Sequence, residues 1–181
     1  MPRKIELINL NSGELNMPLD ELILKTLHNS TLTEELRDAE IECLARVMEV
    51  REVKAGEVLV QPGKDRLTNA LIMLASGEME ATASIGDESA TLHLLQPGDL
   101  AGIITFVGGS AAEISANVVA KADSKVLILE RSKFESLLNS QPAIVYYVMR
   151  GIVRQTHGIV RRMNMQSVEM SNYIHHTHGR Y

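Results

Sequence analysis

The chain has little that would anchor it covalently or in a membrane. Its 181 residues include a single cysteine, Cys43, which cannot form an internal disulfide. Apolar residues surround it at helical spacing (Ile41, Leu44 and Val47) and predict a buried thiol. No stretch approaches the roughly 18 apolar residues that a membrane span needs, and the N-terminus lacks the apolar core of a signal peptide. We therefore expect a reduced, soluble, cytoplasmic protein that does not insert into membranes.

Positive charge is scarce as well. The 18 lysines and arginines are outnumbered by 23 acidic residues, which leaves a formal net charge of -5. This balance argues against broad attraction to nucleic acid or to anionic membranes. One basic stripe stands out locally, because Arg150, Arg154, His157 and Arg161 share one face of a predicted helix. The stripe could meet an acidic partner or a phosphate backbone, and it could equally be a solvated helix face.

Groups that could carry catalysis are also missing. No nucleophile with an adjacent base stands out, nor does a carboxylate pair in a glycine-framed loop. Cupin metal enzymes, which are also β-rolls, need a histidine cluster inside the roll, whereas His93 is the only histidine in the β-rich middle of this chain. His175, His176 and His178 cluster near the C-terminus, where a frayed end cannot fix ligand geometry. We expect no enzymatic activity, no metal site and no cofactor.

Helical patterns flank the β-rich middle. In the N-terminal arm, residues 1–30, the leucines of segment 19–27 fall at helical spacing and predict a short helix. The next segment, 31–49, begins with Thr31 and Glu34 at the spacing of a capping box and continues with an amphipathic pattern. We expect one helix over most of this segment.

Short β-like runs occupy the chain from about Val50 onward, separated by Gly, Pro, Asp and Asn. No helical pattern intervenes, so the runs predict an antiparallel sandwich or a roll closed on itself. The expected fold class is α+β, an antiparallel, double-stranded jelly-roll-like β-roll flanked by N-terminal helices and a long C-terminal helix. Gly63, Gly77, Gly86 and Gly98 lie between runs, where tight turns need a positive φ. The runs are "VREV", "EVLVQPG", "NALIMLASG", "EMEATASIGDES", "ATLHLLQPGD", "ISANVVA" and "SKVLILE".

A second helical region follows the last run. Ser132 and Glu135 again have capping-box spacing, and Pro142 is acceptable in the first turn of a helix. Beyond Pro142, apolar residues recur at alternating spacings of four and three, which is a heptad stripe sustained for about four heptads. The stripe comprises Val145, Met149, Ile152, Thr156, Ile159, Met163, Gln166, Met170 and Tyr173.

The length of this helix favours dimerisation. About thirty helical residues extend roughly 45 Å, well past a closed roll, so we expect a parallel homodimer. The alternative is a helix that packs only on its own roll. Gly151 and Gly158 lie outside the stripe and allow a close approach or a kink. The expected dimer contacts are Val145, Met149, Ile152, Thr156, Ile159, Met163 and Met170.

The order of these elements resembles a known family. The segment "KAGEVLVQPGKDRLTNALIMLASGEMEA" opens the roll with Gly56, Gly63 and Gly77, "QPGDL" adds Gly98, and "SKVLILERSKFESLL" supplies the last strand and a helix. This ordered set resembles the cyclic nucleotide-binding domain family, and within it the sensory half of bacterial catabolite-activator-type regulators. The resemblance covers about residues 31–162.

We accordingly expect four parts. Residues 1–30 form an arm with a short helix, 31–140 a cyclic nucleotide-binding-like β-roll with flanking helices, 141–174 the long dimerisation helix, and 175–181 a flexible histidine-containing tail. Catabolite-activator-type regulators continue with a winged helix-turn-helix that reads DNA. The residues after the heptad stripe are too few for that module, so we expect no DNA binding through it.

By the same resemblance, "PGDLAGIITFVGGSAAEISANVVA" corresponds to the family's phosphate-binding cassette. In members that bind cyclic nucleotides, a glycine and glutamate pair holds the ribose hydroxyl, and an arginine before two small residues neutralises the phosphate. Here Ile103 follows Gly102, and Ile114 precedes Ser115 and Ala116, so both charged anchors are missing. Their loss lowers affinity at least about a hundredfold, since one charge-assisted hydrogen bond contributes roughly 1.5–3 kcal/mol. We expect no binding of cyclic AMP in the usual way.

Other features of the cassette leave two interpretations open. The backbone amides of Gly108, Gly109 and Ser110 could form a small anion nest, or these residues only turn the chain. The isoleucines of the segment would line an apolar pocket that is either empty or accepts an uncharged ligand. The vestigial site that we expect comprises Gly102, Ile103, Ile104, Gly108, Gly109, Ser110, Ile114, Ser115 and Ala116.

The resemblance implies a sensory or adaptor module in which cassette occupancy repositions the helices after the roll and an unidentified protein partner reads the change. Two alternatives stay open. One is a purely structural dimerisation scaffold without a ligand, and the other is a true cyclic-nucleotide or small-ligand sensor with a non-standard pocket.

Overall fold

The computed structural model describes residues 20–61, 67, 69–85, 88–108 and 116–178, with the backbone alone at 83–85, 88–94 and 170–178. The helices α1 (Glu21–His28) and α2 (Asp38–Ala45) precede the strands. The strands are β1 (Glu49–Val53), β2 (Val58–Val60), β3 (Ala70–Ser76), β4 (Met79–Ile85), β5 (Glu88–Leu95), β6 (Leu100–Ala101), β7 (Asn117–Ala120) and β8 (Ser124–Glu130). The helix α3 (Ile103–Phe106) lies between β6 and β7, and α4 (Arg131–Glu135) and α5 (Pro142–His178) follow β8.

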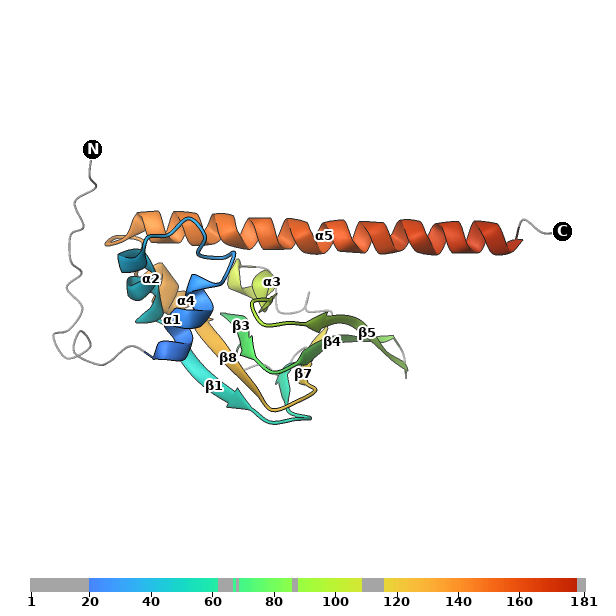
Figure 1. Ribbon diagram of the computed structural model, residues 1–181, viewed down its shortest axis with the longest axis horizontal. Helices are drawn as coiled ribbons and strands as arrows, with labels where there is room; N and C mark the ends of the chain where they lie inside the picture. Colours follow the sequence, from blue (N-terminus) through green and yellow to red (C-terminus); the bar gives the residue numbers. More distant parts are fainter. Residues whose placement is uncertain (1–19, 62–66, 68, 86–87, 109–115, 179–181) are drawn as a thin grey trace.

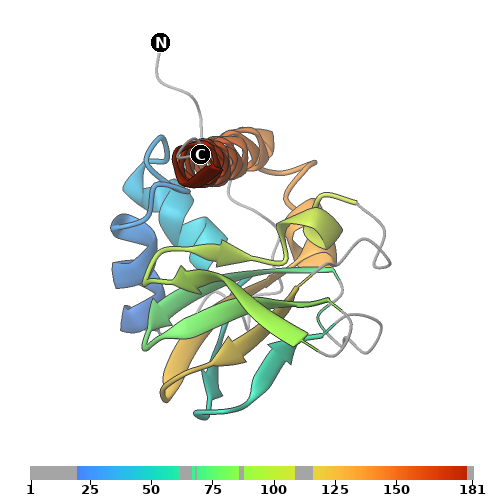
Figure 2. The ribbon, with the colours of Figure 1, turned by 90° about the vertical axis from the view of Figure 1, so that its right-hand side faces the viewer.

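The strands form two antiparallel sheets. One has the order β1-β8-β3-β6 and the other β2-β7-β4-β5, and the sheets face each other as a roll (Figure 2). The helices α1, α2 and α4 cover the first sheet, and α5 runs past them and extends well beyond the roll (Figure 1). This architecture confirms the predicted α+β roll with flanking helices.

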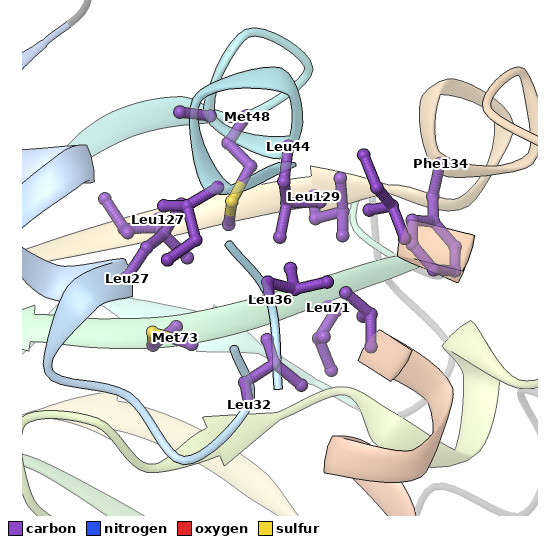
Figure 3. Close-up of a cluster of buried hydrophobic side chains, with 14 of the residues drawn as sticks. Leu27, Leu32, Leu36, Leu44, Met48, Leu71, Met73, Leu127, Leu129 and Phe134 are labelled. Atoms are coloured by element: carbon purple, nitrogen blue, oxygen red, sulfur yellow. The ribbon is translucent and has the colours of Figure 1, made fainter. Parts of the chain in front are cut away.

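The strands β3 and β8 of the first sheet are buried on both faces. Alternate residues of β3, such as Ile72 and Leu74, point between the two sheets into what we term the roll interior. Their neighbours Leu71 and Met73 point to the other side and pack under the helices in what we term the helix-side core (Figure 3). Burial on both faces explains why β3 and β8 read as continuous apolar runs instead of alternating ones.

The helix predicted over 31–49 is much shorter than expected. It begins at Asp38, and its first turn is held by Glu40, whose carboxylate accepts from the Arg37 backbone N–H at 2.9 Å. The predicted capping box at Thr31 and Glu34 is therefore wrong. Residues 29–37 instead form a turn-rich linker whose Leu32 is fully buried in the helix-side core. The packing of the linker against its neighbours overrides the local helical pattern.

The helices after β8 lie where the sequence predicts them, but the predicted capping residue of α4 is wrong. α4 begins at Arg131 after the N-cap Glu130, which makes no side-chain capping bond, so Ser132 is not the cap. Pro142 is the first residue of α5, as predicted. No helix in the described part of the chain, α5 included, is long and apolar enough to span a bilayer.

Two of the predicted turn glycines have the expected backbone. Gly77 and Gly98 adopt φ of 95° and 96°, and a Cβ on Gly77 would lie 2.7 Å from the Ser124 Cα. Gly63 and Gly86 lie outside the described residues. Close packing between turns therefore adds to the conformational requirement for glycine at Gly77.

The thiol of Cys43 is only partly covered. The residue is of intermediate exposure and packs at the edge of the helix-side core, and burial raises the pKa of its thiol. A raised pKa keeps the thiol protonated and unreactive, as its apolar surroundings predict.

Candidate functional site

The first residue of the predicted vestigial site is a glycine that has no room for a side chain. Gly102 caps α3 with φ of 77°, and a Cβ at this position would lie 2.4 Å from the Ala70 carbonyl oxygen of β3. Such an overlap with backbone cannot be relieved by a side-chain movement. Gly102 is therefore required to seat α3 against the sheet, independently of any ligand.

The isoleucines after Gly102 lie in different surroundings. Ile103 is half-buried and packs against the helix-side core, while Ile104 is 47% exposed. Successive residues of a helix point about 100° apart, so the two side chains face different surroundings. The apolar pocket predicted at Ile103, Ile104 and Ile114 stays a prediction, because Ile114 lies outside the described residues.

The rest of the predicted cassette is described only in part. Gly108 is exposed with φ of 99°, and Ala116 is half-buried immediately before β7. The remaining predicted members, Gly109, Ser110, Ile114 and Ser115, lie outside the described residues. The anion nest therefore stays a prediction.

Two contacts fasten α3 to the segment that follows the roll. The rings of Phe106 and Phe134 are both buried, with centroids 5.5 Å apart. The Arg131 guanidinium donates to the Thr105 carbonyl at 3.4 Å and to Asn69 Oδ1 at 2.8 Å. The cassette helix is thus tied to α4 by an apolar and a polar contact. Sequence reasoning missed this role of Arg131, because nothing local relates it to residues 26 and 62 positions away.

The roll interior offers no charge to an anion within the described residues. Its members are aliphatic side chains and methionine from both sheets. Among the buried polar and charged side chains of the described chain, the only charged one is Glu40, which pairs with Arg37 at 2.8 Å on α2. An anion in this interior would therefore lose its hydration without gaining a charged partner from the described residues.

The described residues hold no group of three or more His, Cys, Asp or Glu side chains that could bind a metal ion. Residues 175–178, which include the three histidines, form the last turn of α5.

The predicted heptad stripe of α5 is divided between two environments. Ile152 is 2% exposed and belongs to the helix-side core, and Val145 and Met149 are half-buried against it. Further along, Thr156 is exposed and Met163 is 61% exposed. Ile159 is half-buried, and the side chain of Met170 is not described. The first part of the stripe therefore packs on its own domain, as the alternative interpretation had it.

A different stripe faces away from the domain. Tyr146, Val153 and Val160 follow one another at intervals of seven and are 58%, 64% and 47% exposed. Met149, Thr156 and Met163 alternate with them at spacings of three and four; Thr156 and Met163 are exposed, whereas Met149 lies at the border with the helix-side core. We term these six residues the outer stripe. It is rotated by one residue from the predicted one, since Tyr146, Val153 and Val160 replace Val145, Ile152 and Ile159.

The basic stripe meets acidic groups of its own chain. The Arg150 guanidinium lies 3.1 Å from Glu35 in the linker, and Arg154 pairs with the same carboxylate and lies 3.9 Å from Glu34. Arg161 is exposed on the free part of α5. An acidic partner for Arg150 and Arg154 is thus built into the fold.

Comparison with known proteins agrees with this geometry. A model of the cyclic nucleotide-binding domain family matches residues 50–141. The chain belongs to this family. Cyclic nucleotide-binding domains are regulatory, non-catalytic modules. A comparison with curated proteins returned no match.

Several solved structures share the cyclic nucleotide-binding fold. A cyclic nucleotide-binding domain from Methylobacillus flagellatus has 18% identity, 83% coverage of both chains and a TM-score of 0.72. The Thermus thermophilus catabolite activator protein has 25% identity and a TM-score of 0.61, covering 76% of this chain and 63% of that chain. The regulatory subunit of a cAMP-independent protein kinase A from Trypanosoma brucei has 20% identity and a TM-score of 0.59, covering 77% and 49%. These similarities concern the fold, and the family match itself covers residues 50–141.

Proposed function

We propose that this cyclic nucleotide-binding domain is a non-catalytic sensory or adaptor module that signals through protein contacts and does not bind cyclic AMP in the usual way. The observation that carries the proposal is Ile103. At the position where the family resemblance implies a glutamate, this half-buried side chain packs against the helix-side core. The described roll interior, which contains no buried charge, supports the same conclusion.

The family relationship is compatible with such a module. The Trypanosoma brucei protein is the regulatory subunit of a kinase that is independent of cAMP. The same fold therefore occurs in a regulatory protein that does not depend on this nucleotide.

A thermal-shift titration tests the nucleotide side of the proposal. A ligand present at a thousand times its Kd stabilises a protein by about 4 kcal/mol, so even a micromolar binder would raise the Tm clearly at millimolar concentration. We expect no shift with cyclic AMP or cyclic GMP. The matched variant is Ile114→Arg, which restores the charge implied by the resemblance and is expected to bind more tightly than the natural chain. A clear shift with the natural chain would contradict the proposal.

The helix α4 connects the cassette to α5, the helix that we propose transmits the signal. Phe106 of the cassette packs on Phe134 of α4, and the next buried residue, Leu137, leads into α5 through the same core. A displacement of α3 would therefore be transmitted to the start of α5. This arrangement supports the mechanism implied by the family, in which cassette occupancy repositions the helices after the roll.

We further propose that the output element is a parallel homodimer through the outer stripe. Gln155 makes the last polar contact with the domain that the described side chains show, and from Ile159 to His178 α5 continues for about 30 Å. Exposed apolar residues at alternating spacings of three and four are typical of a two-stranded coiled coil. A second copy of α5 would cover Tyr146, Val153 and Val160 without disturbing Ile152.

Sedimentation velocity with two arginine substitutions tests the dimer. Val153→Arg places a charge in the middle of the outer stripe, and two such charges per dimer raise its dissociation constant at least about a hundredfold. The matched control is Val168→Arg, because Val168 is 59% exposed and lies outside the stripe. We expect the control to dimerise like the natural chain. A monomeric natural chain, or equal effects of both variants, would overturn this part.

The alternative of a structural scaffold differs in one observable. A sensor is stabilised by its ligand, whereas a scaffold shows no shift with any small metabolite while its dimer is retained. Screening the natural chain and Val153→Arg in parallel separates ligand effects from effects on the dimer.

A further inference from the structure

The contacts that hold α5 on its domain change in kind along the helix. Ile144, Val148 and Ile152 are each at most 2% exposed and anchor the first turns in the helix-side core. Near the end of this part of the helix, polar side chains of α5 contact two other segments. These are the linker at 29–37 and the loop before β6. Beyond Thr156 the described side chains are mostly exposed. We term Ile144, Val148 and Ile152 the apolar anchor of α5, and the polar contacts that follow them the polar anchor.

The polar anchor is centred on Glu35. One carboxylate oxygen lies 3.1 Å from Arg150 Nη1, and the other accepts from Arg154 Nη1. A second nitrogen of Arg154 donates to the Thr31 carbonyl at 3.3 Å. One carboxylate therefore holds two arginines that lie one helical turn apart.

A neighbouring glutamine extends the anchor to the roll. The Gln155 amide nitrogen donates to the Thr31 hydroxyl at 3.0 Å and to the Gly98 carbonyl at 3.4 Å. Thr31 belongs to the linker, and Gly98 belongs to the turn between β5 and β6. The linker, the roll and α5 therefore meet at this point.

The linker and the helix fit closely beneath the ion pairs. A Cβ on Gly151 would lie 2.4 Å from the Leu32 carbonyl oxygen, and Leu32 itself is 1% exposed. The absence of a side chain at Gly151 allows the helix to lie flush on the linker. Formation of the ion pairs depends on this close approach, since arginine and glutamate must be within a few ångströms.

We propose that Glu35 is a positioning residue that locks the middle of α5 to the linker, and that opening of this lock lets α5 pivot about its apolar anchor. The side chains of Glu35, Arg154 and Arg150 are 28%, 37% and 49% exposed, so water and salt compete for the pairs. The apolar anchor is closed to water and does not open under the same conditions. The expected consequence of opening is a change in the direction of the outer stripe. This consequence rests on the output role proposed for α5.

Hydrogen exchange on the full chain tests the lock. In Glu35→Gln we expect the protection of backbone amides in 30–37 and 150–158 to fall about three- to tenfold, because local opening sets their exchange. Amides of β3 and β8 serve as the internal reference for an intact fold and are expected to keep their protection. The matched control is Glu42→Gln, which removes the same charge from an exposed position on neighbouring α2.

Salt and a charge exchange sharpen the test. Raising the salt concentration to the molar range should lower protection of the natural chain toward that of Glu35→Gln and leave the variant unchanged. The triple variant Glu35→Arg, Arg150→Glu, Arg154→Glu should recover protection relative to Glu35→Arg alone. Equal behaviour of Glu35→Gln and the natural chain, or of Glu35→Gln and Glu42→Gln, would overturn the lock.

The same samples distinguish this inference from the proposed dimer. If their mass corresponds to a monomer and Glu35→Gln still loses protection, the dimer fails and the lock stands. If the mass corresponds to a dimer and protection is unaffected, the dimer stands and the lock is overturned.

Discussion

The two halves of α5 carry similar side chains but lie in different surroundings. The first half buries Ile144 and Val148 completely in its own domain, whereas Val160 and Met163 in the second half are 47% and 61% exposed. Both halves show apolar residues at heptad spacing. Heptad spacing therefore predicts that one face of a helix is buried, but it does not identify the surface that buries it. Periodicity contains no information about that surface.

The largest expected difference between the halves concerns valine truncation. Val148→Ala removes buried methyl groups and leaves a cavity, so we expect the free energy of unfolding to fall by about 2–3 kcal/mol. Val168→Ala acts on a side chain that is 59% exposed and is expected to stay within about 0.5 kcal/mol. Urea unfolding followed by circular dichroism measures both. Equal losses would show that the second half is packed as firmly as the first.

A pair of glycines seven residues apart gives the next contrast. Gly151→Ala would bring a Cβ within 2.4 Å of the Leu32 carbonyl oxygen, so we expect a loss of about 1–3 kcal/mol. Nothing lies within 4 Å of a Cβ on Gly158, so Gly158→Ala should stabilise the helix by up to about 1 kcal/mol. Thermal unfolding of the two variants gives the sign directly. A stabilising Gly151→Ala would mean that α5 does not lie flush on the linker.

Substitution of one arginine in each half of α5 compares the polar contacts of the two halves. Arg154→Gln removes one of two cations from Glu35, and we expect a loss of about 0.5–1 kcal/mol that shrinks at high salt. Arg161→Gln changes an exposed residue of the free half and is expected to be close to neutral. Unfolding at low and high salt measures both effects. A salt-independent loss for Arg154→Gln would point to packing instead of charge.

The smallest effect on stability is expected from shortening the second half of α5. Removal of residues 164–181 takes away helix whose described side chains are all exposed. At concentrations where the natural chain is monomeric, the free energy of unfolding should change by less than about 0.5 kcal/mol. Calorimetry at several concentrations checks this, because a dimer would show a concentration-dependent Tm only in the full chain. A large loss for the monomer would mean that the free half contacts the domain.

Much of the fold could be predicted from local patterns. The short β-like runs correspond to strands, and the last run, 124–130, coincides with β8. The starts of α2 and α4 could not be predicted from capping-box spacing, since Thr31 and Ser132 do not cap them. At 31–37, burial of Leu32 beneath α5 outweighs a local preference that is worth only about 1 kcal/mol.

The candidate site could be predicted less completely. The residue types show isoleucine at both positions where the family resemblance implies a charge, Ile103 and Ile114. The direction of Ile103 into the helix-side core is not visible there, because it depends on how α3 rests on β3. Arg131 also escaped prediction, since its partners Asn69 and Thr105 lie far from it in the sequence.

The order of the main helices and strands follows from the sequence, as do the isoleucines at both cassette positions where the family resemblance implies a charge, because propensity, periodicity and residue type are local properties of the chain. The tertiary structure alone decided which face of α5 is covered and which carboxylate meets its arginines. Glu35 and Arg154 are 119 positions apart, and only the packing of the linker beneath α5 brings them together. Contacts over such distances depend on the whole fold, so local pattern cannot specify them.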